Sequence, residues 1–191
     1  MRLLGTVLAA VSLGVLAAVL APTGSAAGTV RFGIQDDAWL AHGPGTLEER
    51  LDKLEALGVD LVRFNLHWDR IESTKGSPNW TESDDVLRGL RQRGIAALVG
   101  LVGSPRWANG GRAPNFAPRA AQFAAFARAA AQRYRWVRDW LVWNEPNQAR
   151  WLRPTSPAVY VRQIRLVQTK SLTKRQVSRQ KPNFPRQIGG I

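Results

Sequence analysis

The sequence has 191 residues, with 27 lysine and arginine residues against 14 aspartate and glutamate residues, which gives a formal net charge of +13. It contains no cysteine, so a disulfide framework, a thiol nucleophile and a thiolate metal site are excluded. Hydrophobic residues make up 45% of the chain and charged residues 21%, which indicates one globular domain and not a disordered polyelectrolyte.

The excess positive charge is concentrated at the carboxyl end. Residues 1–145 hold 17 basic and all 14 acidic residues, whereas residues 146–191 hold 10 basic residues and no acidic residue. Because the body is nearly neutral and the basic residues cluster beyond it, we expect no nucleic-acid partner.

The amino end has the pattern of an export signal. Arg2 precedes an apolar run over residues 3–20, and residues 22–27 end in the small side chains that signal peptidase accepts. We therefore expect a signal peptide at residues 1–27, a secreted protein, and no stable membrane insertion after cleavage. The alternative is a retained signal anchor, because about 18 apolar residues is near the lower limit for spanning a bilayer.

Helix signals follow the first predicted strand, at residues 29–34. Thr46 and Glu49 form a capping box, in which each side chain bonds the other residue's backbone amide, and Gly58 is placed to end the helix. The apolar residues of this helix recur at helical spacing: Leu47, Leu51, Leu54 and Leu57.

The same alternation continues along the chain. We predict further strands at residues 59–66, 95–102 and 136–143. We predict further helices at residues 81–93, 118–134 and 157–167. Four strand and helix units over residues 28–167 give 140/4 = 35 residues each. This pattern predicts an α/β fold with a parallel sheet covered by helices.

Polar and aromatic residues follow the predicted strands, where parallel sheets carry their chemistry. They are Gln35, Asp36, Asp37 and Trp39; His67, Trp68, Asp69 and Glu72; Ser104, Pro105, Arg106 and Trp107; Asn144, Glu145, Pro146 and Asn147. Indole faces beside carboxylates and amides are typical of carbohydrate binding. Structural alternatives stay open. Each tryptophan can be a core residue, His67 can be a loop histidine whose hydrogen bonds are made within the protein, and Asp36 and Asp37 can be helix caps.

Several other site types are not indicated. Residues 100–103 lack the glycine spacing of a dinucleotide-binding loop, and no phosphate-binding loop is present. His42 and His67 lack the spacing of metal ligands. We expect no cofactor and no metal, and we assign no function to Asp84 and Asp85, whose charge suits the first turn of a helix.

Residues 143–147, Trp-Asn-Glu-Pro-Asn, resemble the acid/base motif of the clan of retaining glycoside hydrolases with (β/α)8 barrels, which includes cellulase-like and xylosidase-like families. The resemblance extends over residues 30–167 without selecting one family. Its other motifs, in the order of the clan, are Val62-Arg63-Phe64, Trp68-x-x-Ile71-Glu72, Gly94-Ile95, Ser104-Pro105-x-Trp107 and Tyr160-Val161.

This resemblance implies hydrolysis of O-glycosidic bonds in poly- or oligosaccharides. A retaining enzyme needs one carboxylic acid as acid/base and a second carboxylate about 5 Å away as nucleophile. By resemblance, Glu145 is the acid/base, Asn144 bonds the sugar 2-hydroxyl, and Arg63 holds the nucleophile ionised. We expect nearby tryptophans to raise the pKa of Glu145. The alternative for residues 144–146 is a polar turn.

The resemblance also makes four residues candidate substrate-binding walls: His67, Trp68, Trp107 and Trp39. The expected partner is a carbohydrate substrate. Which sugar, and whether cleavage is internal or terminal, does not follow from these residues.

The clan's nucleophile is a glutamate at the end of the seventh strand, and no Asp or Glu follows Glu145 here. We therefore expect the amino-terminal half of a barrel, since a whole barrel has about 250 residues. Residues 168–191 form an off-pattern basic tail, in which only residues 188–191 resemble the start of a fifth strand.

Our hypothesis is a truncation or reading-frame change in a longer gene, which leaves this chain inactive or in need of its other half. The alternatives are a genuine basic tail that attaches the domain to acidic wall polymer or a membrane surface, and a noncatalytic secreted carbohydrate- or cell-surface-binding remnant. Because a half-barrel has unpaired edge strands, we also expect self-association.

Overall fold

The computed structural model of the chain describes residues 30–170. The predicted signal peptide lies outside these residues, as does nearly all of the predicted basic tail. No helix within residues 30–170 is long and apolar enough to cross a bilayer.

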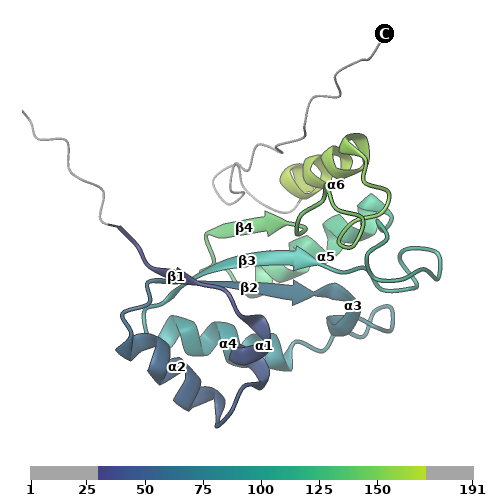
Figure 1. Cartoon of the computed structure of the whole chain (residues 1–191). Helices are drawn as coiled ribbons and strands as arrows, with labels where there is room; N and C mark the ends of the chain where they lie inside the picture. Colours follow the sequence, from purple (N-terminus) through teal and green to yellow (C-terminus); the bar gives the residue numbers. More distant parts are fainter. Residues whose placement is uncertain (1–29, 171–191) are drawn as a thin grey trace, which may run out of the picture. The chain divides into compact units, whose positions relative to one another are not determined.

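Four strands form one parallel sheet in the order of the sequence, β1-β2-β3-β4 (Figure 1). The strands are β1 (Gly33–Ile34), β2 (Leu61–His67), β3 (Ala96–Val102) and β4 (Asp139–Val142). Each strand pairs in parallel with the next one along the chain, and helices connect them. The predicted α/β fold with a parallel sheet is confirmed, although β1 is shorter than the strand predicted at residues 29–34.

The helices are α1 (Asp37–His42), α2 (Leu47–Ala56), α3 (Trp68–Ile71), α4 (Thr81–Gln92), α5 (Ala120–Arg133) and α6 (Pro157–Lys170). The capping box of α2 is confirmed: the Thr46 amide donates to Glu49 Oε2 at 2.7 Å and the Glu49 amide donates to Thr46 Oγ1 at 3.2 Å. Gly58 has φ +69°, the left-handed conformation expected after this helix. Leu57, which continues the helical spacing of the apolar residues, is 68% exposed at the end of α2.

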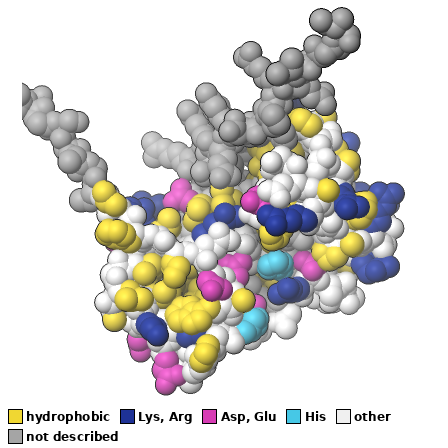
Figure 2. Space-filling view, in the orientation of Figure 1, with side chains coloured by type: hydrophobic (Ala, Val, Ile, Leu, Met, Phe, Trp, Pro, Cys, Tyr) yellow, Lys and Arg dark blue, Asp and Glu magenta, His cyan; other side chains and the backbone are white. Residues whose placement is uncertain are grey.

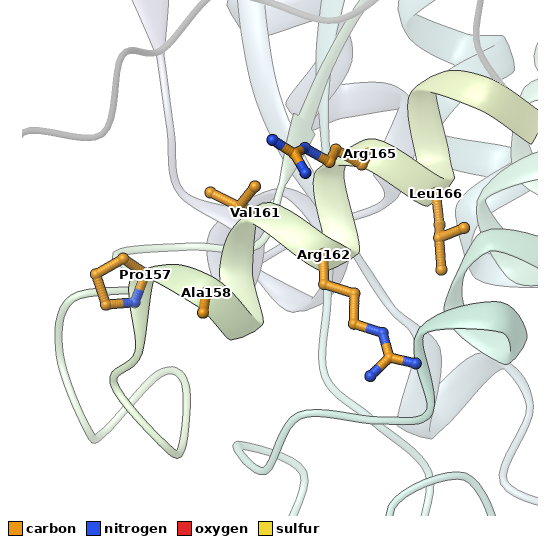
Figure 3. A pocket seen from close by; sticks show the side chains of 6 residues that line it. All are labelled: Pro157, Ala158, Val161, Arg162, Arg165 and Leu166. Atoms are coloured by element: carbon orange, nitrogen blue, oxygen red, sulfur yellow. The ribbon is translucent and has the colours of Figure 1, made fainter.

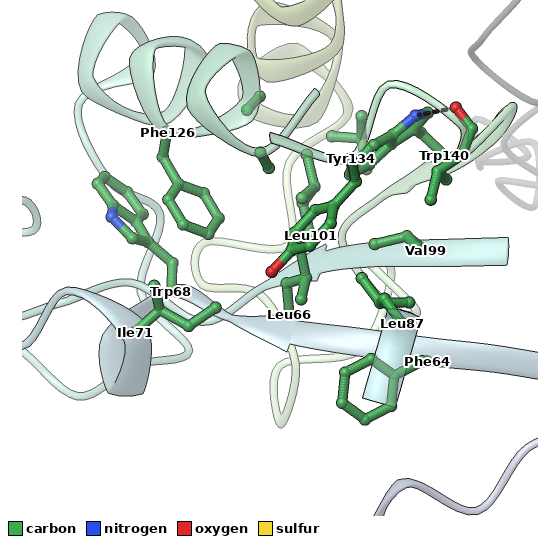
Figure 4. Packing of buried hydrophobic residues seen from close by; sticks show 14 of the residues in the cluster. Phe64, Leu66, Trp68, Ile71, Leu87, Val99, Leu101, Phe126, Tyr134 and Trp140 are labelled. Carbon is green, nitrogen blue, oxygen red and sulfur yellow. Dashed lines mark hydrogen bonds between the residues drawn. The ribbon is translucent and has the colours of Figure 1, made fainter. Parts of the chain in front are cut away.

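The sheet has one apolar face and one more polar face. Side chains alternate along β2, so Val62, Phe64 and Leu66 share one face. They are buried together with Val99 and Leu101 of β3, against side chains of the covering helices (Figure 4). The residues between them on β2 therefore point to the opposite face, toward which the site residues are directed.

Asp84 joins two of the covering helices. It is buried in α4 and accepts hydrogen bonds from Arg133 Nε at 2.6 Å and from the Tyr134 hydroxyl at 3.0 Å, at the end of α5. These bonds, with Arg133 foremost, lower the pKa of Asp84. Beyond its suitability for a helix first turn, Asp84 is thus a buried tie between α4 and α5.

Candidate functional site

The polar face of β2 positions the first group of site residues. Arg63, Asn65 and His67 alternate along β2 and pair in register with Leu98, Gly100 and Val102 of β3. A Cβ atom at Gly100 would overlap the side-chain oxygen of Asn65, so glycine leaves the space in which the Asn65 carboxamide lies. The neighbouring strand therefore makes room for a polar side chain within the sheet.

Arg63 and Asn144 connect the second strand to the end of the fourth. Arg63 Nη2 donates a hydrogen bond of 2.5 Å to Asn144 Oδ1. Both side chains are half-buried. The sequence analysis placed both residues at one site, and the structure brings them into direct contact.

Glu145 lies in an irregular turn directly after β4. Trp143 and Glu145 have φ values of +66° and +35°, in the region that side-chain-bearing residues rarely adopt. Strained backbone of this kind is found preferentially at functional sites. The turn leaves Glu145 exposed, beside Asn144.

The electrostatic setting of Glu145 differs from the one expected. Its Oε2 atom pairs with Arg150 Nη2 at 2.9 Å, and this hydrogen bond lowers the pKa of the Glu145 carboxyl. The expectation that nearby tryptophans raise this pKa is wrong, because the carboxyl is exposed and an arginine is its nearest charged partner. The role of Arg150 was not foreseen, since nothing in the spacing of the two residues predicts that the loop folds back.

A pocket of about 230 Å³ lies beside this turn. His67, Trp143, Arg150 and Trp151 are among its lining residues, so it joins the end of β2 to the loop after β4. Burial and the nearby Arg70 lower the pKa of His67. The imidazole is therefore neutral at pH 7 and can donate or accept a hydrogen bond to a polar ligand.

Asp37 and Asn65 form a pair that the sequence analysis missed. Asn65 Nδ2 donates to Asp37 Oδ2 at 2.7 Å, and burial raises the pKa of Asp37 despite this bond. Asp36, by contrast, caps α1 through the Trp39 amide, as the capping alternative proposed. The alternation of Arg63, Asn65 and His67 along one strand was the available signal for Asn65.

Trp68 is a core residue. Its side chain has no exposed surface and stacks on Phe126 of α5 with ring centroids 5.2 Å apart, while Nε1 donates to Glu72 Oε2 at 2.8 Å. The expectation that Trp68 forms a substrate-binding wall is wrong, because the first turn of α3 directs it toward the helices and away from the polar face.

Trp107 and Trp39 do not line the His67 pocket. Trp107 is half-buried, packs edge-on against Trp68 and donates Nε1 to the Glu72 carbonyl at 2.8 Å. It lines a separate pocket of about 390 Å³ beside α5, together with Trp80. Trp39 is half-buried in α1 and packs against the core. Of the four predicted walls, only His67 lies in the pocket beside Glu145.

A larger hollow runs along α6 and lies elsewhere (Figure 3). Its volume is about 630 Å³, and its lining residues are Pro157, Ala158, Val161, Arg162, Arg165 and Leu166. No carboxylate, imidazole or hydroxyl lines it. The candidate site is therefore the smaller pocket at the carboxyl ends of β2, β3 and β4.

Comparisons with known proteins support the fold. No family model matches this sequence, and no curated protein matches it. Among solved structures, an exo-β-1,4-mannosidase from Opitutaceae bacterium strain TAV5 matches 74% of this chain with a TM-score of 0.56 and 18% identity. A family 39 glycoside hydrolase from Bacteroides cellulosilyticus WH2 matches 73%, with a TM-score of 0.55 and 18% identity. The chain has the fold of a partial (β/α)8 barrel.

The endoglucanase Cel5A from Pseudomonas stutzeri, solved with cellobiose, matches 74% of this chain with a TM-score of 0.51 and 15% identity. The partial barrel spans 30%, 29% and 46% of the mannosidase, family 39 and endoglucanase structures, so it covers less than half of each. At these identities the likeness establishes the arrangement of strands and helices, and the chemistry has to be argued from the residues themselves.

Proposed function

We propose that this chain supplies the acid/base half of a retaining glycoside hydrolase, with Glu145 as the acid/base. The proposal is supported chiefly by the contact of Arg63, on β2, with the carboxamide of Asn144, which directly precedes Glu145 in the turn after β4. Glycoside hydrolases among the structural matches, which share this fold, add support.

Each residue has a distinct part in the proposed reaction. Glu145, protonated, would give its proton to the leaving-group oxygen and later take a proton from the attacking water. Asn144 would use its Nδ2 group to bond the sugar 2-hydroxyl, because Arg63 already occupies its Oδ1 atom. Arg63 orients that carboxamide and would attract a second carboxylate. This chain has no carboxylate after Glu145, so we propose that the nucleophile is supplied from outside it.

The ion pair with Arg150 has to change for this chemistry to occur. A carboxylate held ionised is a poor proton donor at neutral pH, and Arg150 lowers the pKa of Glu145. A bound saccharide that displaces Arg150 would remove this effect. The acid/base would then form only in the complex.

The same ion pair favours a second candidate function, noncatalytic binding of carbohydrate. An ionised Glu145 with Asn144 and His67 nearby can bond sugar hydroxyls without transferring a proton. This function requires no second carboxylate.

Turnover of 4-nitrophenyl glycosides, with and without added azide, tests the proposal. Azide is a small anionic nucleophile that can replace an absent carboxylate by attacking the anomeric carbon as nitrophenol leaves. We expect nitrophenol release to depend on azide and to fall in Glu145→Gln, with Glu72→Gln as a control. No release from any glycoside in the presence of azide would contradict catalysis, and saccharide binding without release would support the second candidate.

We also propose that the protein is exported through residues 1–27. Detection of the chain in the culture medium with a new amino terminus near residue 28 tests this, and an intact amino terminus in the membrane fraction would instead indicate a signal anchor.

A further inference from the structure

Exposed arginines gather in the loops around the candidate site. The loop after β3, residues 103–119, and the loop after β4, residues 143–156, together contain five arginines against one acidic residue, Glu145. The arginines are Arg106, Arg112, Arg119, Arg150 and Arg153, and all of them are exposed. Figure 2 shows Lys and Arg side chains gathered on the side of the molecule where these loops lie.

Three arginines of α4, its carboxyl end and α5 have carboxylate partners. Arg88 and Arg133 pair with Asp84, and Arg93 pairs with Glu48 and Asp52. Around the site, only Arg150 has such a partner within residues 30–170. The other four loop arginines and the nearby Arg70 form no salt bridge with the described residues. Exposed arginines without a salt bridge to a described carboxylate also occur elsewhere in the fold, as at Arg91 and Arg128, but the loops around the site gather several of them.

Two of these arginines line the pocket itself. Arg70 follows β2 and Arg150 follows β4, and Trp143 and Trp151 also line the pocket. Arg150 is also positioned over the Trp151 ring, 5.8 Å from its centroid. A ligand with an apolar ring face and a negatively charged substituent matches both kinds of lining.

We propose that the site binds an anionic saccharide, whose carboxylate or sulfate group is received by Arg70 and Arg150. This inference rests on the proposed function and specifies its substrate class. The pocket volume of about 230 Å³ suits a sugar ring. Planar guanidinium groups bind carboxylate and sulfate through paired hydrogen bonds.

The test compares saccharides of equal length by calorimetry on the full chain. The ligands are an oligogalacturonate, a sulfated oligosaccharide and a neutral cello-oligosaccharide. We expect the anionic ligands to bind at least about tenfold more tightly at low salt, with the advantage shrinking as salt rises. Tighter binding of the galacturonate assigns a carboxylate, and tighter binding of the sulfated ligand assigns a sulfate; either result supports the proposal.

Variants locate the binding, because residues 171–191 also carry positive charge. Arg70→Ala and Arg150→Ala should each weaken anionic binding about five- to tenfold. Arg128→Ala removes an equal charge from the exposed side of α5 and should change nothing. Three outcomes would overturn the inference. The neutral ligand could bind as tightly as the anionic ligands, Arg70→Ala and Arg150→Ala could bind them no more weakly than Arg128→Ala, or a random oligonucleotide could bind more tightly than the saccharides. Binding of the neutral cello-oligosaccharide alone would contradict the inference and leave the proposed function supported. Binding of none of the three saccharides would contradict both the inference and the proposed function.

Discussion

Arg63 on β2 donates a hydrogen bond of 2.5 Å to the side-chain oxygen of Asn144, which lies 81 residues later in the chain. The bond crosses β3, so it links β2 to the residues that follow β4, and these two strands do not pair with each other. It fixes the orientation of the Asn144 carboxamide and leaves the Asn144 Nδ2 group for another partner.

Removal of this contact should destabilise the fold. In Asn144→Ala, the half-buried Arg63 guanidinium loses its partner, and we expect the free energy of unfolding to fall by about 1–2 kcal/mol. Urea denaturation measures the change. Asn147→Ala, which removes an exposed carboxamide from the same loop, should cost less than about 0.5 kcal/mol. Equal losses in the two variants would show that the contact contributes nothing to stability.

Replacement of Arg150 should change the titration of Glu145. Arg150 lowers the pKa of the Glu145 carboxyl, so Arg150→Ala should raise that pKa toward its ordinary value. NMR titration of the Glu145 side-chain carboxyl carbon measures this. Arg106→Ala removes an exposed arginine from the neighbouring loop and serves as the control. An unchanged Glu145 pKa in Arg150→Ala would mean that the ion pair does not persist in solution.

Loss of Asp84 should have a large effect that depends on pH. Asp84→Ala leaves the exposed Arg133 guanidinium and the buried Tyr134 hydroxyl without their acceptor, and we expect the free energy of unfolding at pH 7 to fall by about 2 kcal/mol. Because the pKa of Asp84 is lowered in the folded state, its contribution is present above the ordinary pKa of 3.8 and is lost as pH falls through the folded value. The gap between wild type and Asp84→Ala should therefore narrow below pH 4.

The matched control is Asp85→Ala, which removes the exposed neighbouring carboxylate on the same helix turn. Urea denaturation at pH 7 and at pH 3 measures both variants. A gap between wild type and Asp84→Ala that stayed constant across this range would refute the assigned ion pair.

Gly103 should tolerate substitution less well than Gly110. Both glycines have positive φ, +72° and +75°, so alanine at either position costs about 1–2 kcal/mol of backbone strain. At Gly103 the added Cβ would also overlap Asp69 Oδ1, whereas at Gly110 nothing lies within 4 Å of it. Because the backbone strain is common to both, the difference in thermal midpoint between Gly103→Ala and Gly110→Ala measures the effect of the overlap with Asp69. Equal midpoints for the two variants would mean that Asp69 moves away without cost.

We propose that the outer edges of strands β1 and β4, which pair with no other described strand, cause self-association. They are the edges of the sheet, and Phe32 beside β1 is 68% exposed. Sedimentation velocity of the full chain should show concentration-dependent dimers or larger species, reduced in Phe32→Lys. Leu57→Lys, at an exposed apolar position on α2, is the control. A single monomeric species at all concentrations would contradict this proposal.

Local signals in the sequence determined the elements of this fold. The capping box of Thr46 and Glu49, the glycine at position 58 and the apolar strand runs act over a few residues, so their effects can be read without knowing the tertiary structure. The order of strands follows as well, because short crossovers place successive parallel strands side by side. Asn144 and Glu145 could be assigned to the rim on the same basis, whereas Arg63 was assigned to the site by resemblance.

Tertiary structure alone decided the roles of the other residues. Trp68 follows β2 as a rim residue would, but the first turn of α3 directs it into the core. Asp84 was interpreted from its helix position alone, yet its partners come from α5. The pKa of Glu145 depends on how the loop to Arg150 folds back. Burial and charge pairing depend on which side chains far apart in the sequence come into contact. Neither secondary-structure propensity nor spacing along the chain specifies those tertiary contacts.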